Sequence, residues 1–98
     1  MRINLNNNGL IAILFTTHSC GACHPIDAQI SSAIATDYPK IKYIKLNLEE
    51  NPELRGSLLV FSAPTFLLMI DGKELLRESG VFSVIGLLEK IERIYTSI

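Results

Sequence analysis

The apolar run LIAILF, from Leu10 to Phe15, is the feature that most restricts how this chain folds. No polar residue interrupts it, which is typical of a strand that helices bury on both faces. The run is also far too short to cross a membrane as a helix. We therefore expect a central buried strand, with helices supplied by the rest of the chain.

The two segments that follow have different periodicities. After the cysteines, apolar residues recur at helical spacing, and this segment extends to about Tyr38, before Pro39. These residues are Ile26, Ile30, Ala33 and Ile34. The segment from Lys42 to Leu48 (KYIKLNL) alternates and is typical of a strand whose Ile44, Leu46 and Leu48 share one side. A strand, a helix and a second strand this close together predict a right-handed parallel unit.

The second half of the chain carries turn and cap signals. Asn51-Pro52 is an N-cap and first-turn pair, so a short helix or turn is expected over Glu53 to Leu59. Two arms, Phe66 to Ile70 and Lys73 to Ser79, flank Asp71-Gly72, which is a strong hairpin signal. Gly80 ends the second arm.

Ser83 is a candidate cap for a last helix. Its predicted inner face consists of Val84, Leu87, Leu88, Ile91 and Tyr95. The full order is β-α-β, short α, β-β, α, which predicts an α/β sandwich. With 98 residues and no repeat or linker, we expect residues 1–98 to form one domain with one core.

Composition and charge exclude several classes of protein. Nine basic and ten acidic residues are spread along the chain and form no basic stripe, so nucleic acid is not an expected partner. We expect no secretory leader, because the apolar run lacks the basic segment and the small-residue cleavage site of a signal peptide. Two cysteines three positions apart are not the framework of a disulfide-stapled secreted domain. We therefore expect a cytoplasmic protein with no membrane association.

The run HSCGACHP, from His18 to Pro25, is compatible with three chemistries. C-x-x-C is the spacing of a redox dithiol, whereas C-x-x-C-H also attaches c-type haem. The two histidines and two cysteines of the run are, in addition, four possible metal ligands.

The position of the motif favours the dithiol. Between a buried strand and a helix, Cys20 falls at or just before the helix N-terminus, where free amide groups and the helix dipole favour a thiolate. Cys23 then lies in the first helical turn on the same face and within reach of a disulfide with Cys20. Two unrelated buried cysteines are the plainer alternative.

Haem and zinc fit the rest of the chain less well. Haem needs a second axial ligand and a helical wrap, but Met69 lies inside an apolar strand. Structural zinc sites usually take a second ligand pair from a distant segment, and the chain has no further Cys or His. We expect no metal, with His24 on the helix surface and His18 in a loop.

In these motifs and their order, the chain resembles the thioredoxin superfamily, and thioredoxin more than glutaredoxin. The resemblance covers about Leu10 to Ile94 and includes CGAC, IKLNLEENP, SAPTFLLMIDGKE and Gly80. It implies a three-layer sandwich with a mixed sheet of about four strands, flanked by helices. A short fifth strand from Arg2 to Leu5 is possible beside Lys42 to Leu48; a bare edge there would invite weak dimerisation.

The resemblance also implies roles for individual residues. Cys20 resembles the nucleophile of the family and Cys23 its resolving thiol, with Gly21 and Ala22 between them. Pro64, followed by Thr65, resembles a proline whose preceding peptide bond is cis. Ala63 would then offer its backbone to an extended substrate segment, for which Gly80 leaves room. Lys45 resembles a buried lysine of the family, although a solvated lysine is the plainer view.

Three positions depart from the family pattern. Ser19 replaces a loop tryptophan, and Ala22 replaces the proline between the cysteines, so the redox loop is less restrained. Leu14 stands where the family carries a buried aspartate beneath the inner cysteine. An apolar side chain cannot accept a proton, so slow resolution by Cys23 is expected unless Lys45 or His24 substitutes.

The sequence thus predicts a thiol-disulfide oxidoreductase that needs no cofactor beyond its own Cys20–Cys23 disulfide. Its expected partners are disulfide-containing proteins and an external reductase such as a thioredoxin reductase, with the chain a monomer or weak dimer. A glutaredoxin-like protein, or a non-catalytic or single-partner binding module with the same fold, remains the alternative.

Overall fold

The four strands form one mixed sheet in the order β2-β1-β3-β4. The computed structural model describes residues 9–80 and 82–98. In chain order its elements are β1 (Leu10–Thr16), α1 (Cys23–Asp37), β2 (Ile41–Asn47), α2 (Pro52–Leu58), β3 (Thr65–Ile70), β4 (Lys73–Ser79) and α3 (Val84–Thr96). Strand β1 pairs with β2 in parallel and with β3 antiparallel, and β4 extends the sheet as a hairpin partner of β3. The predicted α/β architecture is confirmed.

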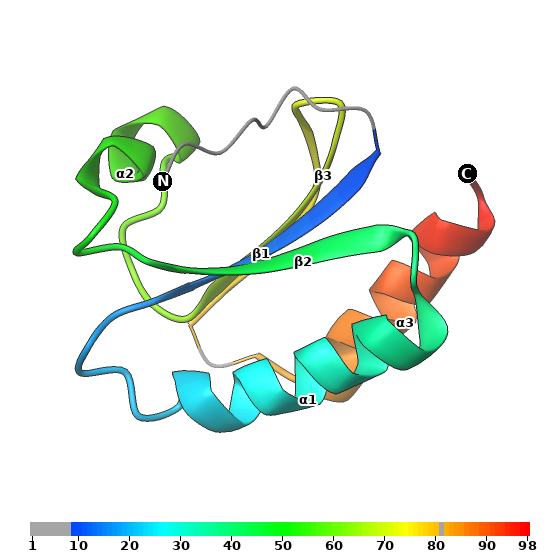
Figure 1. The fold of residues 1–98 in the computed structure, drawn as a ribbon, viewed down its shortest axis with the longest axis horizontal. Coiled ribbons are helices and arrows are strands. Elements are labelled where there is room, and N and C mark those ends of the chain that lie inside the picture. Colours follow the sequence, from blue (N-terminus) through cyan, green and yellow to red (C-terminus); the bar gives the residue numbers. More distant parts are fainter. Residues whose placement is uncertain (1–8, 81) are drawn as a thin grey trace.

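Helices cover both faces of the sheet, as the apolar run predicted. Helices α1 and α3 lie on one face and α2 lies on the other (Figure 1). Because successive side chains of a strand point to opposite faces, β1 contributes to both cores. Leu14 packs in the core under α1 and α3, whereas Ile13 and Phe15 pack in the core that also holds Leu54 and Leu58 of α2.

Helix α2 differs from its prediction in two details. It spans Pro52–Leu58, one residue earlier than predicted at each end. Asn51 occupies the N-cap position, but its side chain makes no cap hydrogen bond. Its amide instead donates to the Asn47 carbonyl at 2.9 Å and thus braces the turn that leaves β2. Leu59 closes the helix in a left-handed conformation, with φ 55°.

The predicted hairpin and the last cap are confirmed. Asp71 and Gly72 both have positive φ, 50° and 81°, as the tight turn between two twisted strands requires. Ser83 caps α3, because its Oγ accepts a hydrogen bond from the Gly86 amide at 3.0 Å. Leu87 and Ile91 of the predicted inner face are buried.

One prediction on the fold falls outside the described residues. The possible fifth strand, Arg2 to Leu5, belongs to the segment 1–8, which the structure does not describe. Within residues 9–80 and 82–98, β2 is one edge strand of the sheet. None of the helices in this part of the chain has the length and apolar character needed to span a membrane.

Candidate active site

Cys20 and Cys23 are joined by a disulfide, with their Cα atoms 5.4 Å apart. Cys23 is the first residue of α1 and thus lies in its first turn, as predicted. It is buried, with 4% of its surface exposed. Cys20 lies in the turn before the helix, ahead of the N-cap residue Ala22, and is partly exposed. A substrate arriving from solvent therefore meets Cys20 first.

The helix N-terminus holds the two cysteines together through the backbone. The Cys23 amide donates to the Cys20 carbonyl at 3.2 Å, so this N–H is already satisfied locally. Pro25, the third residue of α1, has no N–H to offer. The first turn of α1 therefore offers fewer free amide donors than a typical helix to stabilise a thiolate at Cys20.

A small hollow of about 150 Å³ opens beside the disulfide. Its lining residues come from the end of β1, the loop that follows it, the start of α1 and strand β2: Thr16, Thr17, Cys20, Cys23, His24 and Lys45. The fold thus brings the predicted modulating residues His24 and Lys45 to the cysteines. His24 itself is exposed in the first turn of α1, as predicted.

Lys45 lies at the surface. The expectation of a solvated lysine is therefore correct, and the buried lysine that the resemblance implied is not found. Its side chain is 53% exposed, and its Nζ lies 3.2 Å from Oδ2 of Asp27 in α1. The other carboxylate oxygen of Asp27 accepts a hydrogen bond from the Tyr43 hydroxyl at 2.7 Å. Burial, the hydrogen bond to Asp27 and the charge of that carboxylate raise the pKa of Tyr43, which therefore remains a donor.

Leu14 is fully buried in the sheet next to this cluster. It is the partner of Lys45 across the parallel pairing of β1 with β2, and of Phe66 across the pairing with β3. Its side chain joins the core cluster that contains Ile30 of α1. The position at which the resemblance implies a buried aspartate is thus filled by hydrocarbon.

A second loop contains the proline predicted to be cis. The Ala63–Pro64 peptide bond is cis. Thr65 is fully buried, and its hydroxyl donates to the Ser62 carbonyl at 2.8 Å, so its side chain holds the loop together. The Gly80 amide donates to the Pro64 carbonyl at 3.0 Å. A side chain at Gly80 would project into open space, so its φ of 74° is the reason for glycine at this position.

His18 lies in the loop before the cysteines, as predicted. Its amide donates to a carboxylate oxygen of Glu49 at 2.8 Å, and its ring Nε2 lies 3.7 Å from Glu50. These contacts join the loop that carries Cys20 to the turn that follows β2.

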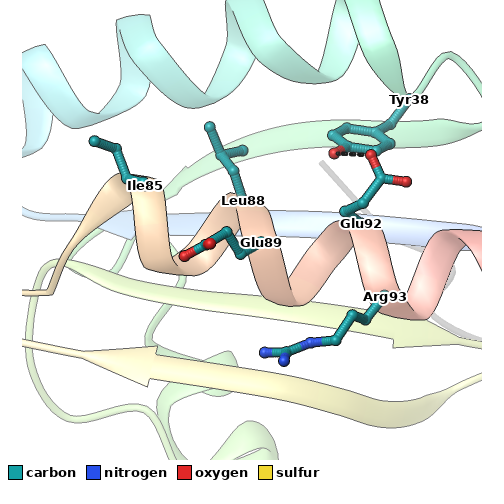
Figure 2. A pocket seen from close by; sticks show the side chains of 6 residues that line it. All are labelled: Tyr38, Ile85, Leu88, Glu89, Glu92 and Arg93. Carbon is teal, nitrogen blue, oxygen red and sulfur yellow. Dashed lines mark hydrogen bonds between the residues drawn. The ribbon is translucent and has the colours of Figure 1, made fainter.

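A larger hollow lies away from the cysteines, beside α3. It measures about 500 Å³ and is lined by Tyr38, Ile85, Leu88, Glu89, Glu92 and Arg93. Figure 2 shows Ile85 and Leu88 pointing from α3 toward α1, with Arg93 on the opposite side. The Tyr38 hydroxyl donates to Glu92 at 3.1 Å, and burial followed by this bond raises the pKa of Tyr38. The residues that line this hollow include no cysteine.

Comparison with known proteins identifies the family. The family model described as Thioredoxin matches residues 2–93. The chain belongs to the thioredoxin family. Thioredoxin-like protein YdfQ of Bacillus subtilis is 32% identical over 85% of this chain and 73% of its own length. A thioredoxin of Chlamydia trachomatis is 29% identical over 88% of this chain and 83% of its own length.

Solved structures show the same fold. The thioredoxin of Fasciola hepatica superimposes with a TM-score of 0.76 at 33% identity, over 90% of this chain and 83% of that one. The chain belongs to the thioredoxin family and carries the Cys20–Cys23 disulfide, so it is a thiol-disulfide oxidoreductase. The predicted fold class and reaction type are therefore confirmed. Within the described residues, no three His, Cys, Asp or Glu side chains gather as metal ligands would.

Asp27 was not among the residues singled out from the sequence. Two signals pointed to it: it lies four positions after Cys23 on the same helix face, and Tyr43 and Lys45 share one face of the alternating strand. Neither signal shows that α1 packs against that face of β2. The contact of Asp27 with Tyr43 and Lys45 is therefore visible only in the folded chain.

Proposed function

We propose that this thioredoxin-family protein reduces disulfide bonds of protein substrates, with Cys20 as the attacking thiol and Cys23 as the resolving thiol. The observation that supports these roles is the unequal burial of the two bonded cysteines. Cys20 is partly exposed, whereas Cys23 is 4% exposed at the start of α1. A thiolate must reach the substrate sulfur directly, so the exposed cysteine attacks first.

The reaction transfers two electrons in two exchange steps. The Cys20 thiolate attacks one sulfur of the substrate disulfide, whose S–S bond breaks as a mixed disulfide forms. The released substrate thiolate takes a proton from water. Cys23 then loses its proton and attacks the Cys20 sulfur, which forms the Cys20–Cys23 disulfide and releases the second substrate thiolate. An external reductase returns two electrons and restores the dithiol.

The loop that precedes β3 is the proposed substrate-binding surface. In this proposal Ala63 offers its backbone to an extended substrate segment beside Pro64, and Gly80 leaves the path of that segment open. Gly21 and Ala22, both exposed between the cysteines, contact the substrate from the other side. The open space around Gly80 supports this arrangement.

Insulin disulfide reduction tests the assigned roles. Cys20→Ser is expected to abolish activity, whereas Cys23→Ser is expected to form a mixed disulfide with insulin and stop there. An assay with glutathione as reductant serves as the control for glutaredoxin-like activity. If Cys23→Ser turns over at the wild-type rate, or Cys20→Ser forms the mixed disulfide, the assigned roles are wrong.

The proposed setting is the cytoplasm, with residues 1–98 acting as one domain. Electrons are proposed to come from a reductase such as a thioredoxin reductase, which NADPH oxidation in a coupled assay would detect. We also propose a monomer or weak dimer, since β2 is an edge strand of the described sheet. Light scattering over a range of protein concentrations measures this, and a stable dimer at low concentration would contradict it.

A further inference from the structure

We propose that Asp27 is a positioning residue for the redox site, because it holds the Lys45 ammonium at the hollow beside Cys20 and Cys23. There the cation stabilises the thiolate of the reduced protein. The inference deepens the proposed function and rests on the same two cysteines.

The first support is the geometry of Asp27. It lies four residues after Cys23 on α1, so both side chains point to the same face of the helix. The Asp27 side chain is only 19% exposed, and each of its oxygens has a donor. Tyr43 donates to Oδ1 at 2.7 Å, and Lys45 donates to Oδ2 at 3.2 Å. A carboxylate held at both oxygens is a rigid anchor for a lysine.

The second support is the place to which Lys45 is held. Lys45 lines the hollow together with both cysteines, although its side chain is 53% exposed. An unanchored lysine on a strand would sample many rotamers in solvent and spend little time near a thiolate. The contact with Asp27 restricts those rotamers and, in this proposal, keeps the ammonium at the hollow that both cysteines line, where it lowers the pKa of the thiols in the dithiol form.

The proposal predicts that neutralising Asp27 shifts the pKa of the thiol in the direction opposite to that of a simple charge effect. If Asp27 acts only as a nearby anion, its neutralisation lowers the pKa of the thiol. If Asp27 anchors Lys45, the same change frees the cation and raises the pKa of the thiol. The two roles of Asp27 are therefore distinguished by the direction of one measured shift.

The titratable groups around the thiols define the variants to be compared. His24 of α1 and Lys45 of β2 line the hollow, with Asp27 and Tyr43 behind Lys45. Asp27→Asn preserves an acceptor for Tyr43, and Lys45→Met removes the cation. His24→Gln tests the other titratable side chain of the hollow. Asp37→Asn is the matched control, because it removes the same charge from the exposed end of α1.

The measurement is the rate at which iodoacetamide alkylates Cys20 in the reduced protein as a function of pH, with circular dichroism as the check of folding. Asp27→Asn and Lys45→Met are each expected to raise the apparent pKa and slow alkylation at neutral pH by about three- to tenfold. The double variant is expected to match Lys45→Met alone, since Asp27 acts through Lys45. Asp37→Asn is expected to match the wild type.

Three results would overturn the inference: a lowered or unchanged pKa in Asp27→Asn, additive effects in the double variant, or a shift confined to His24→Gln. The titration uses no protein substrate. A wild type that fails to reduce insulin but shows these shifts would refute the proposed function and leave the role of Asp27 standing.

Discussion

Leu14 and Lys45 are direct partners across the parallel pairing of β1 with β2. Leu14 is fully buried, whereas Lys45 lines the hollow beside the two cysteines. The sheet thus puts hydrocarbon at the position where the thioredoxin resemblance implies a buried aspartate. In the described residues, Lys45 forms a hydrogen bond with one carboxylate only, that of Asp27 in α1.

Leu14→Asp is expected to speed resolution of the mixed disulfide by Cys23, because the introduced carboxylate accepts a proton beside Lys45. The same change is expected to lower the free energy of unfolding by about 3 kcal/mol or more, since it removes a buried leucine and buries a charge. Single-turnover reduction of a chromogenic disulfide measures the resolving step. Leu14→Asn is the control for polarity without a proton acceptor, and a slower or unchanged Leu14→Asp would contradict the expectation.

Arg77 connects β4 to the end of α2, and its loss is expected to loosen that end. Its guanidinium donates to the carbonyls of Leu58 at 2.6 Å and Leu59 at 2.9 Å. Arg77→Met is expected to cost about 1 to 3 kcal/mol in urea unfolding, because two carbonyls lose a charged donor. Arg93→Met, an exposed position on α3, is the matched control, and equal stability of the two variants would argue against this role.

Glu74 is expected to make stability dependent on pH in the acid range. The hydrogen bonds from Arg77, more than the opposing effect of partial burial, lower the pKa of the Glu74 carboxyl. A carboxyl with a lowered pKa in the folded state stabilises the fold above its unfolded pKa, and this stability is lost as pH falls through the folded pKa. Because the Glu74 side chain is 42% exposed, the effect is expected to be about half a kcal/mol.

The measurement for Glu74 compares unfolding of the wild type and Glu74→Gln at neutral and acid pH. The wild type is expected to be the more stable protein at neutral pH, and the difference is expected to shrink on acidification. A difference that stays constant, or grows, as pH falls would refute the assigned role.

Ser83→Ala is expected to lower the free energy of unfolding by about 1 kcal/mol, because the Gly86 amide at the start of α3 loses its hydrogen bond to the Ser83 hydroxyl. Ser32→Ala, on the exposed face of α1, is the matched control and is expected to be neutral or slightly stabilising. If the two variants unfold at the same urea concentration, the Ser83 cap contributes nothing.

Much of the active site was predictable from short stretches of sequence. The CGAC run between a buried strand and a helix predicted the bonded pair, and the resemblance to thioredoxins implied the cis bond before Pro64. The exposed fraction of the Lys45 side chain was not predictable, because alternation along β2 shows which face a residue takes and not how far solvent reaches the end of its side chain. Asn51 occupies the predicted N-cap position, but its side chain makes no cap hydrogen bond. Its amide donates instead to the Asn47 carbonyl, which is close only once the turn has formed.

The sequence by itself determined the order of the elements, the hairpin turn at Asp71-Gly72, the cap at Ser83 and the spacing of the two cysteines. Each of these depends on residues only a few positions apart, so local backbone preferences are sufficient to specify them. Only the tertiary structure decided that Asp27 meets Tyr43 and Lys45, 16 and 18 positions away, or that Arg77 reaches the end of α2. Such contacts depend on how a helix packs against a sheet face, which is set by the whole core.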